Sequence, residues 1–437
     1  MKAPQRPGFS KNDAALAVLL VLFLLVAGIS MTAVLQNSVP GHENFWSAVA
    51  GTLLLAGFIP LFVLARFSFG YVVGISFYWM IISFFWYTYF TVQHYDHVLA
   101  RWSAVASLLL FLLPVLFQTI ALPRRLALSP RGMNRLLLLL LGAALLTLAW
   151  SASYGFAFVG LQDSERLRAA ILRPGILNYL IGALTGAVLP FAFAYFAWHG
   201  RYVLAALAVL LIAGFYPVVL NKSVVFGAVW LPFLFVMFKA FEPKRATILA
   251  LLIPVALGLL IYELVPSGGR LGYWPSYVFG TVNVRFFAFP AIAMDRYSDF
   301  FASHPLTHFC QIGIVRAIYG CPYPFQLGVA MAEAYHLGNL NASLFATEGI
   351  ASVGPLWAPI SALVCGLMLS VGNSASARLP PPLLAASAGL AVQQALLNVP
   401  LSANLLSNGA LVLWLLWAVT PEMAGSTAPL PGIVSKT

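Results

Sequence analysis

Long apolar runs recur along the chain, and short polar or charged breaks separate them. Each run offers the roughly 20 residues that a helix needs to cross a hydrocarbon core of about 30 Å. Because the runs are continuous rather than alternating, they predict helices and not barrel strands. We expect twelve spans, near residues 14–36, 46–65, 70–91, 102–121, 134–153, 175–198, 202–219, 223–240, 246–265, 345–371, 381–399 and 404–420.

The composition excludes a water-soluble protein. Hydrophobic residues make up 61% of the 437 positions and charged residues only 8%, with a mean hydropathy of +0.92, which is typical of membrane chains. The expected fold class is therefore an all-α polytopic membrane protein. Residues 1–265 would hold nine spans with short loops, 266–343 one large extracytoplasmic loop, 344–420 three further spans, and 421–437 a cytoplasmic tail.

Basic residues predict the orientation. The compact loops 122–135 and 241–245 are strongly basic and fall on the same side as the amino terminus, together with more than half of the 23 basic residues. The positive-inside rule then places both termini in the cytoplasm. The first span is longer than a signal-peptide core and lacks a small-residue cleavage site, so we expect it to be retained. The net charge of +11 reflects this topology, and we expect no nucleic-acid partner.

Three cysteines occur, at positions 310, 321 and 365. Cys365 falls within a span, as a small core residue would. Cys310 and Cys321 both fall in the large loop, where an oxidising compartment permits a disulfide, and two buried thiols are the alternative. No zinc-like ligand spacing accompanies them, so we expect neither metal nor cofactor.

Basic residues on the predicted outer side run against the topological bias, which suggests another reason for their presence. Guanidinium groups bind phosphate bidentately and keep their charge at physiological pH, so converging arginines would suit a pyrophosphate-bearing lipid. Local pairing is the alternative: Asp163 and Glu165 with the neighbouring arginines, and Asp299 with Arg296. The residues concerned are Arg166, Arg168, Arg173, Lys222, Arg270, Arg285, Arg296 and Arg316.

Four ionisable residues lie near the end of the large loop: His304, Glu333, His336 and Glu348. Glu348 would lie about one turn inside a span, where a carboxylate is costly unless it faces a polar cavity or a partner. Glu333 and His336 are three residues apart and would share a helix face, as an acid/base pair or as a local hydrogen bond.

The stretch from about 283 to 372 resembles the bacterial oligosaccharide repeat-unit polymerases, the O-antigen and exopolysaccharide polymerase group of the C-type membrane glycosyltransferases. Family members often have Asp-Gly-Tyr where this chain has Glu348-Gly349-Ile350. The segments that carry the resemblance are Arg285 to Pro290, Tyr297 to Phe301 with His304-Pro305, Pro322-Tyr323-Pro324, and Asn339 to Gly354 with Asn341.

The resemblance implies a multi-pass protein of the bacterial inner membrane that acts on a polyprenyl-pyrophosphate-linked glycan. A growing chain would pass from one lipid to a sugar hydroxyl of a repeat unit on another, outside the membrane and without a metal. Arg285 would hold the leaving pyrophosphate, helped by Lys222 and Arg173, and Glu348 or His336 would orient or deprotonate the acceptor. A chain-length regulator would be the expected protein partner.

Three other functions remain open. An O-antigen ligase shares the architecture and the lipid substrate. A lipid-linked glycan flippase or another transporter would carry polar residues along many spans, whereas here they concentrate outside. A membrane acyltransferase would need a His/Asp constellation, for which Tyr95 with His94, Asp96 and His97 is the candidate.

Overall fold

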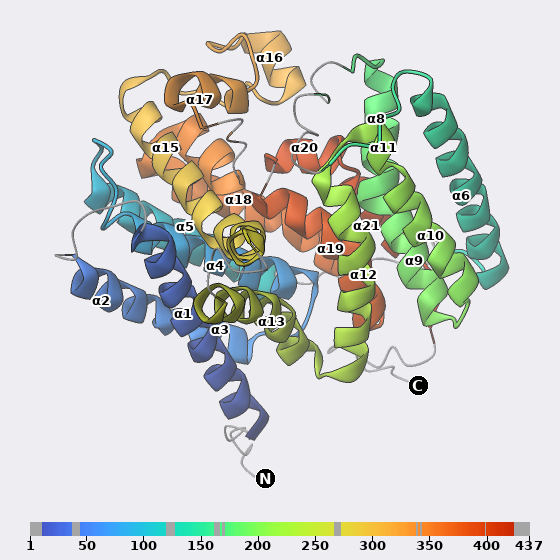
Figure 1. Ribbon diagram of the computed structural model, residues 1–437, viewed down its shortest axis with the longest axis horizontal. Coiled ribbons are helices and arrows are strands. Elements are labelled where there is room, and N and C mark those ends of the chain that lie inside the picture. Colours follow the sequence, from blue (N-terminus) through green and yellow to red (C-terminus); the bar gives the residue numbers. More distant parts are fainter. Residues whose placement is uncertain are drawn as a thin grey trace, which may run out of the picture. The chain divides into compact units, whose positions relative to one another are not determined.

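The computed structural model describes residues 11–36, 44–118, 127–160, 167, 171–265, 272–337, 340, 343–397 and 399–423. Over these ranges the chain is helical and contains no strand (Figure 1). Eleven of the described helices are long and apolar enough to cross a membrane, which confirms a helical, membrane-embedded protein. They are Asn12–Leu35, Phe45–Leu64, Phe69–Tyr87, His97–Phe117, Pro130–Ala152, Gly175–Trp198, Tyr202–Val219, Lys222–Ala240, Pro243–Leu264, Trp274–Ser303 and Phe345–Ser376.

The chain forms two compact units. Unit 1 comprises Met1–Gln118, Ala240–Ser370 and Val392–Leu406, and unit 2 comprises Thr119–Lys239, Val371–Ala391 and Ser407–Thr437. Unit 1 contains α1 (Lys11–Gln36), α2 (Phe45–Leu55), η1 (Ala56–Phe58), α3 (Ile59–Leu64), α4 (Phe69–Tyr87), α5 (His97–Phe117), α13 (Pro243–Leu264), α14 (Trp274–Phe279), η4 (Gly280–Ala288), α15 (Phe289–Ser303), α16 (Gly313–Tyr319), α17 (Leu327–Tyr335), η5 (Phe345–Ala351), most of α18 (Ser352–Ser376) and α20 (Leu401–Leu406).

Helix starts in unit 1 follow ordinary capping chemistry. The Ser68 side chain accepts a hydrogen bond from the Tyr71 amide at the start of α4, and Asp96 accepts one from Leu99 at the start of α5. Such caps satisfy amides that have no partner within the helix. They mark where polar breaks in the sequence become helix boundaries.

Unit 1 has two ends, at which its long helices begin or finish. At one end, Lys244 at the start of α13 donates to the Val63 carbonyl near the end of α3, and Arg245 donates to the Asn12 side chain at the start of α1. We call this the proximal end, and the opposite end, where α4 finishes and α5 begins, the distal end. Helices α1, α4 and α13 therefore all run from proximal to distal.

Helix α4 occupies the centre of unit 1. Eighteen of its 19 residues are buried, from Phe69 to Tyr87 with no exposed face. It packs against α1, α2, α5, α13, α15 and η4. A helix that is apolar all round and buried all round is the core of a bundle.

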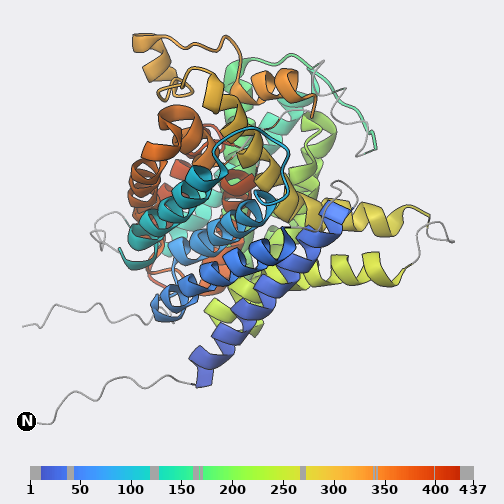
Figure 2. The same ribbon diagram turned by 90° about the vertical axis from the view of Figure 1, so that its left-hand side faces the viewer.

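A continuous helical segment of 30 residues, Trp274–Ser303, lies where the sequence predicts an extracytoplasmic loop. It consists of α14, the π-helix η4 and α15, and it packs against α1, α4 and α13. In Figure 2 the yellow α14 and η4 run beside α13, and the darker α15 climbs away from them. Its most apolar 18-residue window has a mean hydropathy of 1.3, the lowest among the eleven candidates, and the whole segment contains Arg285, Asp295, Arg296 and Asp299.

Unit 2 holds α6 (Pro130–Ala152), α8 (Gly175–Ala183), the π-helix η3 (Leu184–Val188), α9 (Leu189–Trp198), α10 (Tyr202–Gly214), α11 (Tyr216–Val219), α12 (Lys222–Ala240), the first part of α19 (Pro381–Leu397) and α21 (Ala410–Ala418). Gly182 and Gly186 face the backbone of residues 407 and 408 so closely that a Cβ at either glycine would clash with a carbonyl oxygen. Small residues four apart allow such close approach in membranes.

The expected count of twelve spans is not reproduced in the described residues. Helix α19 matches the expected 381–399 in position but has 17 residues. The expected span 404–420 is broken, because α20 ends at Leu406 and α21 begins at Ala410 after Gly409, which has a φ of 77°. Polar residues at Asn404 and Asn408 accompany the break.

Candidate functional site

The two residues that sequence reasoning ranks highest both lie in π-helices of unit 1. Arg285 lies in η4 and Glu348 in η5. The sequence assigned the first of these helices to the large loop and the second to the start of the span that follows it. Because π-helical turns are rare and concentrate at functional sites, the backbone marks these two positions independently of their charge.

Glu348 is 4% exposed and is surrounded by hydroxyl groups. Thr347 donates from Oγ1 to Glu348 Oε2 at 2.5 Å, and Ser402 in α20 approaches Oε1 with its amide at 3.3 Å and its hydroxyl at 3.4 Å. Ser361 in α18 donates to the Glu348 carbonyl at 2.6 Å. Glu348 therefore lies within a candidate span, as the sequence predicts. Its buried carboxylate has the polar partners that burial requires.

A small cavity lies among α4, α5, α15, η5 and α18, and Phe345 and Ile350 are the residues of η5 that line it. Three serine hydroxyls, from Ser103, Ser107 and Ser298, share its wall with Phe84 and Phe345. Phe345 belongs to the same π-helix as Glu348. The cavity thus combines hydroxyl groups with an apolar wall, next to the helix that carries Glu348.

Arg285 points away from the packed side of η4. Asn283 and Phe287 of the same helix are fully buried, whereas Arg285 is exposed and its guanidinium lies 4.8 Å from the centre of the Phe289 ring. Phe286, its neighbour, lies against Trp79 in the middle of α4. An ionisable residue within a candidate membrane-spanning helix is a functional candidate by default.

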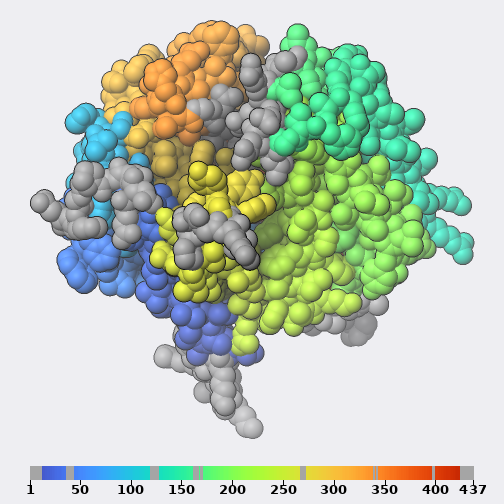
Figure 3. Space-filling view, viewed as in Figure 1, coloured from blue at the N-terminus to red at the C-terminus, as the bar shows by residue number. Residues whose placement is uncertain are grey.

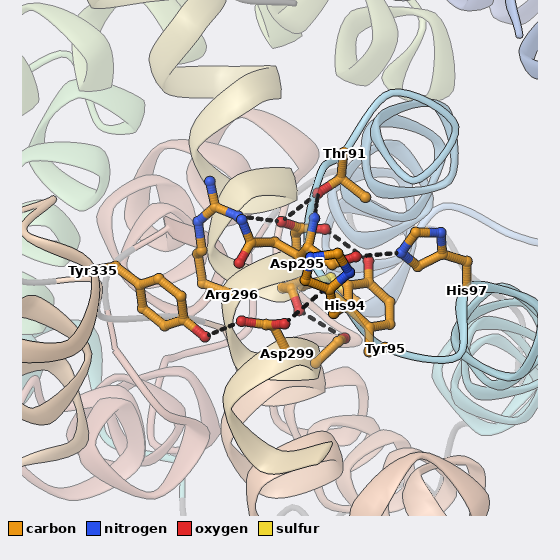
Figure 4. Close-up of polar contacts among 11 residues, drawn as sticks. Thr91, His94, Tyr95, His97, Asp295, Arg296, Asp299 and Tyr335 are labelled. Carbon is orange, nitrogen blue, oxygen red and sulfur yellow. Dashed lines mark hydrogen bonds and ion pairs between the residues drawn. The ribbon is translucent and has the colours of Figure 1, made fainter. Parts of the chain in front are cut away.

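A second polar cluster, which we call the distal network, joins α15 to the segment between α4 and α5 (Figure 4). Asp295 is fully buried and accepts hydrogen bonds from Tyr95 at 2.7 Å, from Thr91 at 3.0 Å and from Arg296 at 2.9 Å. Asp299 accepts from the Tyr335 hydroxyl at 2.6 Å and from the His94 amide at 3.0 Å. The network therefore ties residues 91–95, α15 and α17 together.

Burial keeps the tyrosines of the distal network in their neutral, donating form. Burial first, and then the charge of Asp295, raises the pKa of Tyr95 far above its usual range. Burial and the hydrogen bond to Asp299 likewise raise the pKa of Tyr335. Both side chains remain hydrogen-bond donors to a carboxylate at any physiological pH.

Arg296 is paired with Asp295, not with Asp299 as the sequence alternative had it. Its guanidinium also lies 5.4 Å from the centre of the Tyr335 ring. Adjacent residues on a helix do not normally face each other, so Asp295 was not an obvious partner. The pair is part of the distal network and leaves Asp299 to Tyr335.

Residues 304–326 form a disulfide-bonded lobe at the distal end. Cys310 and Cys321 are bonded, with their Cα atoms 5.3 Å apart, which decides between the two alternatives left open by the sequence. His304 stacks on Phe300 at 3.9 Å, and Arg316 donates to the Pro324 carbonyl at 2.8 Å. Arg316 thus binds the lobe's own backbone. Cys365 is a buried free thiol, as expected.

The predicted shared face of Glu333 and His336 is not formed. Helix α17 ends at Tyr335, and His336 follows it with a left-handed φ of 55°. Both side chains are exposed. The helix ends one residue too early for the two to stack as an i, i+3 pair.

Arg173 and Lys222 belong to unit 2, whereas Arg285 and Glu348 belong to unit 1. Arg173 donates to the Val218 carbonyl, in the turn that leads to Lys222, and burial lowers the pKa of its guanidinium. Lys222 is exposed at the start of α12. The remaining predicted ligands, Arg166, Arg168, Arg270 and Asn341, lie outside the described residues.

Sequence reasoning missed Asp295, the centre of the distal network. The sequence shows an acidic residue inside an apolar stretch. That stretch was assigned to a loop, and an acidic residue is ordinary in a loop. Tyr95 entered the sequence analysis only as part of a candidate acyltransferase site. Comparison with protein-family models, curated proteins and solved structures gives no match.

Proposed function

We propose that the protein is a polymerase of polyprenyl-pyrophosphate-linked oligosaccharide repeat units, in the inner membrane of a bacterium with both termini in the cytoplasm. The supporting observation is that segments carrying the family resemblance, far apart in sequence, contact one another. Tyr323 donates to the Pro305 carbonyl at 2.7 Å, and Tyr297 donates to Leu340 at 3.2 Å. Two residues after Pro305, the Thr307 amide bonds the Ala351 carbonyl at 2.8 Å.

The chemistry assigned to this site needs a cation and a proton acceptor. The acceptor hydroxyl attacks the anomeric carbon of the growing chain, the bond to pyrophosphate breaks, and the pyrophosphate leaves with the bonding electrons. Arg285 would stabilise the charge that develops on the pyrophosphate. Glu348 would take the hydroxyl proton, within a shell of hydroxyl donors that can hold its charge.

Reconstitution tests the proposal. The purified protein in lipid bilayers is given a lipid-linked repeat unit, and the products are separated by length. A ladder of longer products, lost in Glu348→Gln and in Arg285→Gln, is expected. Glu263→Gln and Arg66→Gln remove exposed charges elsewhere in unit 1 and should keep the ladder.

Absence of a ladder from the wild type with a suitable repeat unit would refute the polymerase. Transfer of the glycan once, to an acceptor that is not a repeat unit, would indicate a ligase. A ladder that survives Arg285→Gln unchanged in length and amount would remove Arg285 from the mechanism.

A further inference from the structure

The 30-residue segment Trp274–Ser303 is long enough to cross a membrane, but its contacts do not advance from one end of unit 1 to the other. Phe279, near its start, packs on Tyr262 with ring centres 4.3 Å apart, and also on Ala33 and Leu259. These residues lie near the distal ends of α13 and α1. The segment therefore starts at the distal end.

The middle of the segment lies at the middle of the bundle. Asn283 donates to Ser30 at 3.0 Å and to the Val255 carbonyl at 2.9 Å, one step deeper than Phe279. Phe287 then stacks on Trp79, near the midpoint of α4, at 4.8 Å. The chain has descended about half the length of α4.

The second half of the segment returns. Asp295 bonds Thr91 and Tyr95, and Asp299 bonds the His94 amide, all of which lie beyond the distal end of α4. The turning point coincides with the end of η4 and with Pro290, in the first turn of α15. A π-helix and a proline are recognised causes of a sharp bend.

The lengths agree with a bent path. As a straight helix, 30 residues would extend about 45 Å, well beyond a hydrocarbon core of about 30 Å. The bent path carries Asp295, Arg296 and Asp299 back to the distal end and leaves Arg285 as the ionisable residue near the bend. A straight crossing would place Arg285, Asp295 and Arg296 within the hydrocarbon core, which is unfavourable.

Residues 343–354 repeat the pattern on the other side of α4. Phe345 packs on Phe77 and Phe111, both in the middle of their helices, at 5.1 and 5.5 Å. Six residues later, Ala351 bonds Thr307 in the distal lobe. Gly354, with a φ of 77°, then turns the chain.

Helix α18 runs back alongside η5 after this turn. A Cβ on Gly349 would lie 3.3 Å from the Cβ of Ala358, and Ser361 bonds the Glu348 carbonyl at 2.6 Å. Residues nine and thirteen apart could not meet in a straight helix, which rises about 1.5 Å per residue. Phe287 and Phe345, the deepest side chains of the two segments, thus rest on Trp79 and Phe77 of one helix.

We infer that residues 274–303 and 343–354 are two re-entrant segments, which enter and leave the membrane at the distal side. They hold Arg285 and Glu348 at middle depth on two sides of α4, and Arg285 is accessible from the distal side only. Irregular backbone at such depth is tolerated where it is buried in protein or lines a polar cavity. The inference rests on contacts alone and holds whether or not the proposed function does. It also explains how a disulfide at 310–321 and a basic proximal loop coexist, because Ser303 returns to the side of Trp274.

Cysteine labelling tests this topology in the full chain. In a Cys365→Ala background that keeps the disulfide, the exposed residues Tyr273 and Ser303 are replaced singly by cysteine, with Arg66→Cys as the proximal reference. A membrane-impermeant maleimide is applied to sealed vesicles of each orientation. We expect Tyr273→Cys and Ser303→Cys to react from one side and Arg66→Cys from the other; reaction of the first two from opposite sides would overturn the inference.

A second labelling experiment tests the depth and accessibility of Arg285. Arg285→Cys should react with a small impermeant thiol reagent from the distal side only, at least 10-fold faster than Leu139→Cys, an exposed position in the middle of α6. Reaction from the proximal side, or no reaction above the Leu139→Cys rate, would refute the inferred position of Arg285. Variants are compared only if they elute as monodisperse protein, and Glu263→Cys, at the distal end of α13, replaces Tyr273→Cys if that variant does not.

Discussion

The contact between Gly258 of α13 and Asn283 of η4 gives a sharp test of the fold. A Cβ added at Gly258 would approach Asn283 Oδ1 to well under the 3.0 Å that real Cβ atoms respect. Asn283 has no exposed surface and is held by Ser30 and by the Val255 carbonyl, so it cannot swing away. We therefore expect Gly258→Ala to push α13 and η4 apart.

The expected size follows from overpacking and helix propensity. Overpacking a tight contact costs about 1–3 kcal/mol. Alanine in a helix interior returns about 1 kcal/mol relative to glycine. At about 2 °C per kcal/mol for a large chain, Gly258→Ala should melt up to about 4 °C below the wild type.

Two further variants isolate the cause. Gly142→Ala, in α6, meets no atom within 4 Å and should melt at or slightly above the wild-type temperature. Asn283→Ala removes the clashing oxygen, so the double variant should lose less than the sum of the single losses. Melting in detergent, followed by tryptophan fluorescence, measures the wild type and all four variants. If Gly258→Ala has the same melting temperature as Gly142→Ala, the described contact between α13 and η4 is refuted.

Three further predictions concern other parts of the chain. Replacing Cys310 and Cys321 by serine should release an 11-residue link, at a cost of up to about 3 kcal/mol, and make the distal lobe sensitive to added protease; equal protease resistance would contradict its role. Because the pKa of Tyr95 is raised, its stabilising effect is present below about pH 10 and lost as pH rises further, so melting temperature should fall above that pH, and Tyr95→Phe should flatten the fall. Gly182→Ala, which meets the carbonyl oxygen of Ser407, should lower the yield of folded protein, whereas a yield equal to that of Gly142→Ala would argue against this close approach.

Hydropathy alone located the first nine spans to within a few residues, because each is a continuous apolar run between polar breaks. It did not single out the helical segment 274–303, where charged residues at 285, 295, 296 and 299 interrupt the apolar run. The buried carboxylate of Asp295 is accommodated in this segment by hydrogen bonds from Thr91 and Tyr95, some 200 residues earlier in the chain. No local pattern contains that pairing.

In the candidate site, too, some residues could be predicted from the sequence and others could not. Glu348 could be singled out from sequence, because a carboxylate near the start of an apolar run is costly wherever it lies. Its partner Ser402 could not, since it follows a polar break 54 residues later. The π-helical turns at 280–288 and 345–351 also have no simple sequence signal, and His336 was misplaced because a helix was extended by one residue too many.

The burial of α4 has a consequence for synthesis in the membrane. Roughly 190 residues separate Tyr87 from Trp274, so at ordinary translation rates α4 is inserted about 10–40 s before the segments that cover it exist. During that time its aromatic surface and Ser76 and Ser83, all buried in the finished protein, face lipid or an insertion factor. Ser76 can donate a hydrogen bond to the Val72 carbonyl of its own helix, so its hydroxyl has a partner before the covering segments are synthesised. Truncated chains that stop before residue 274 should therefore be inserted but degraded rapidly, whereas chains that extend past 354 should persist.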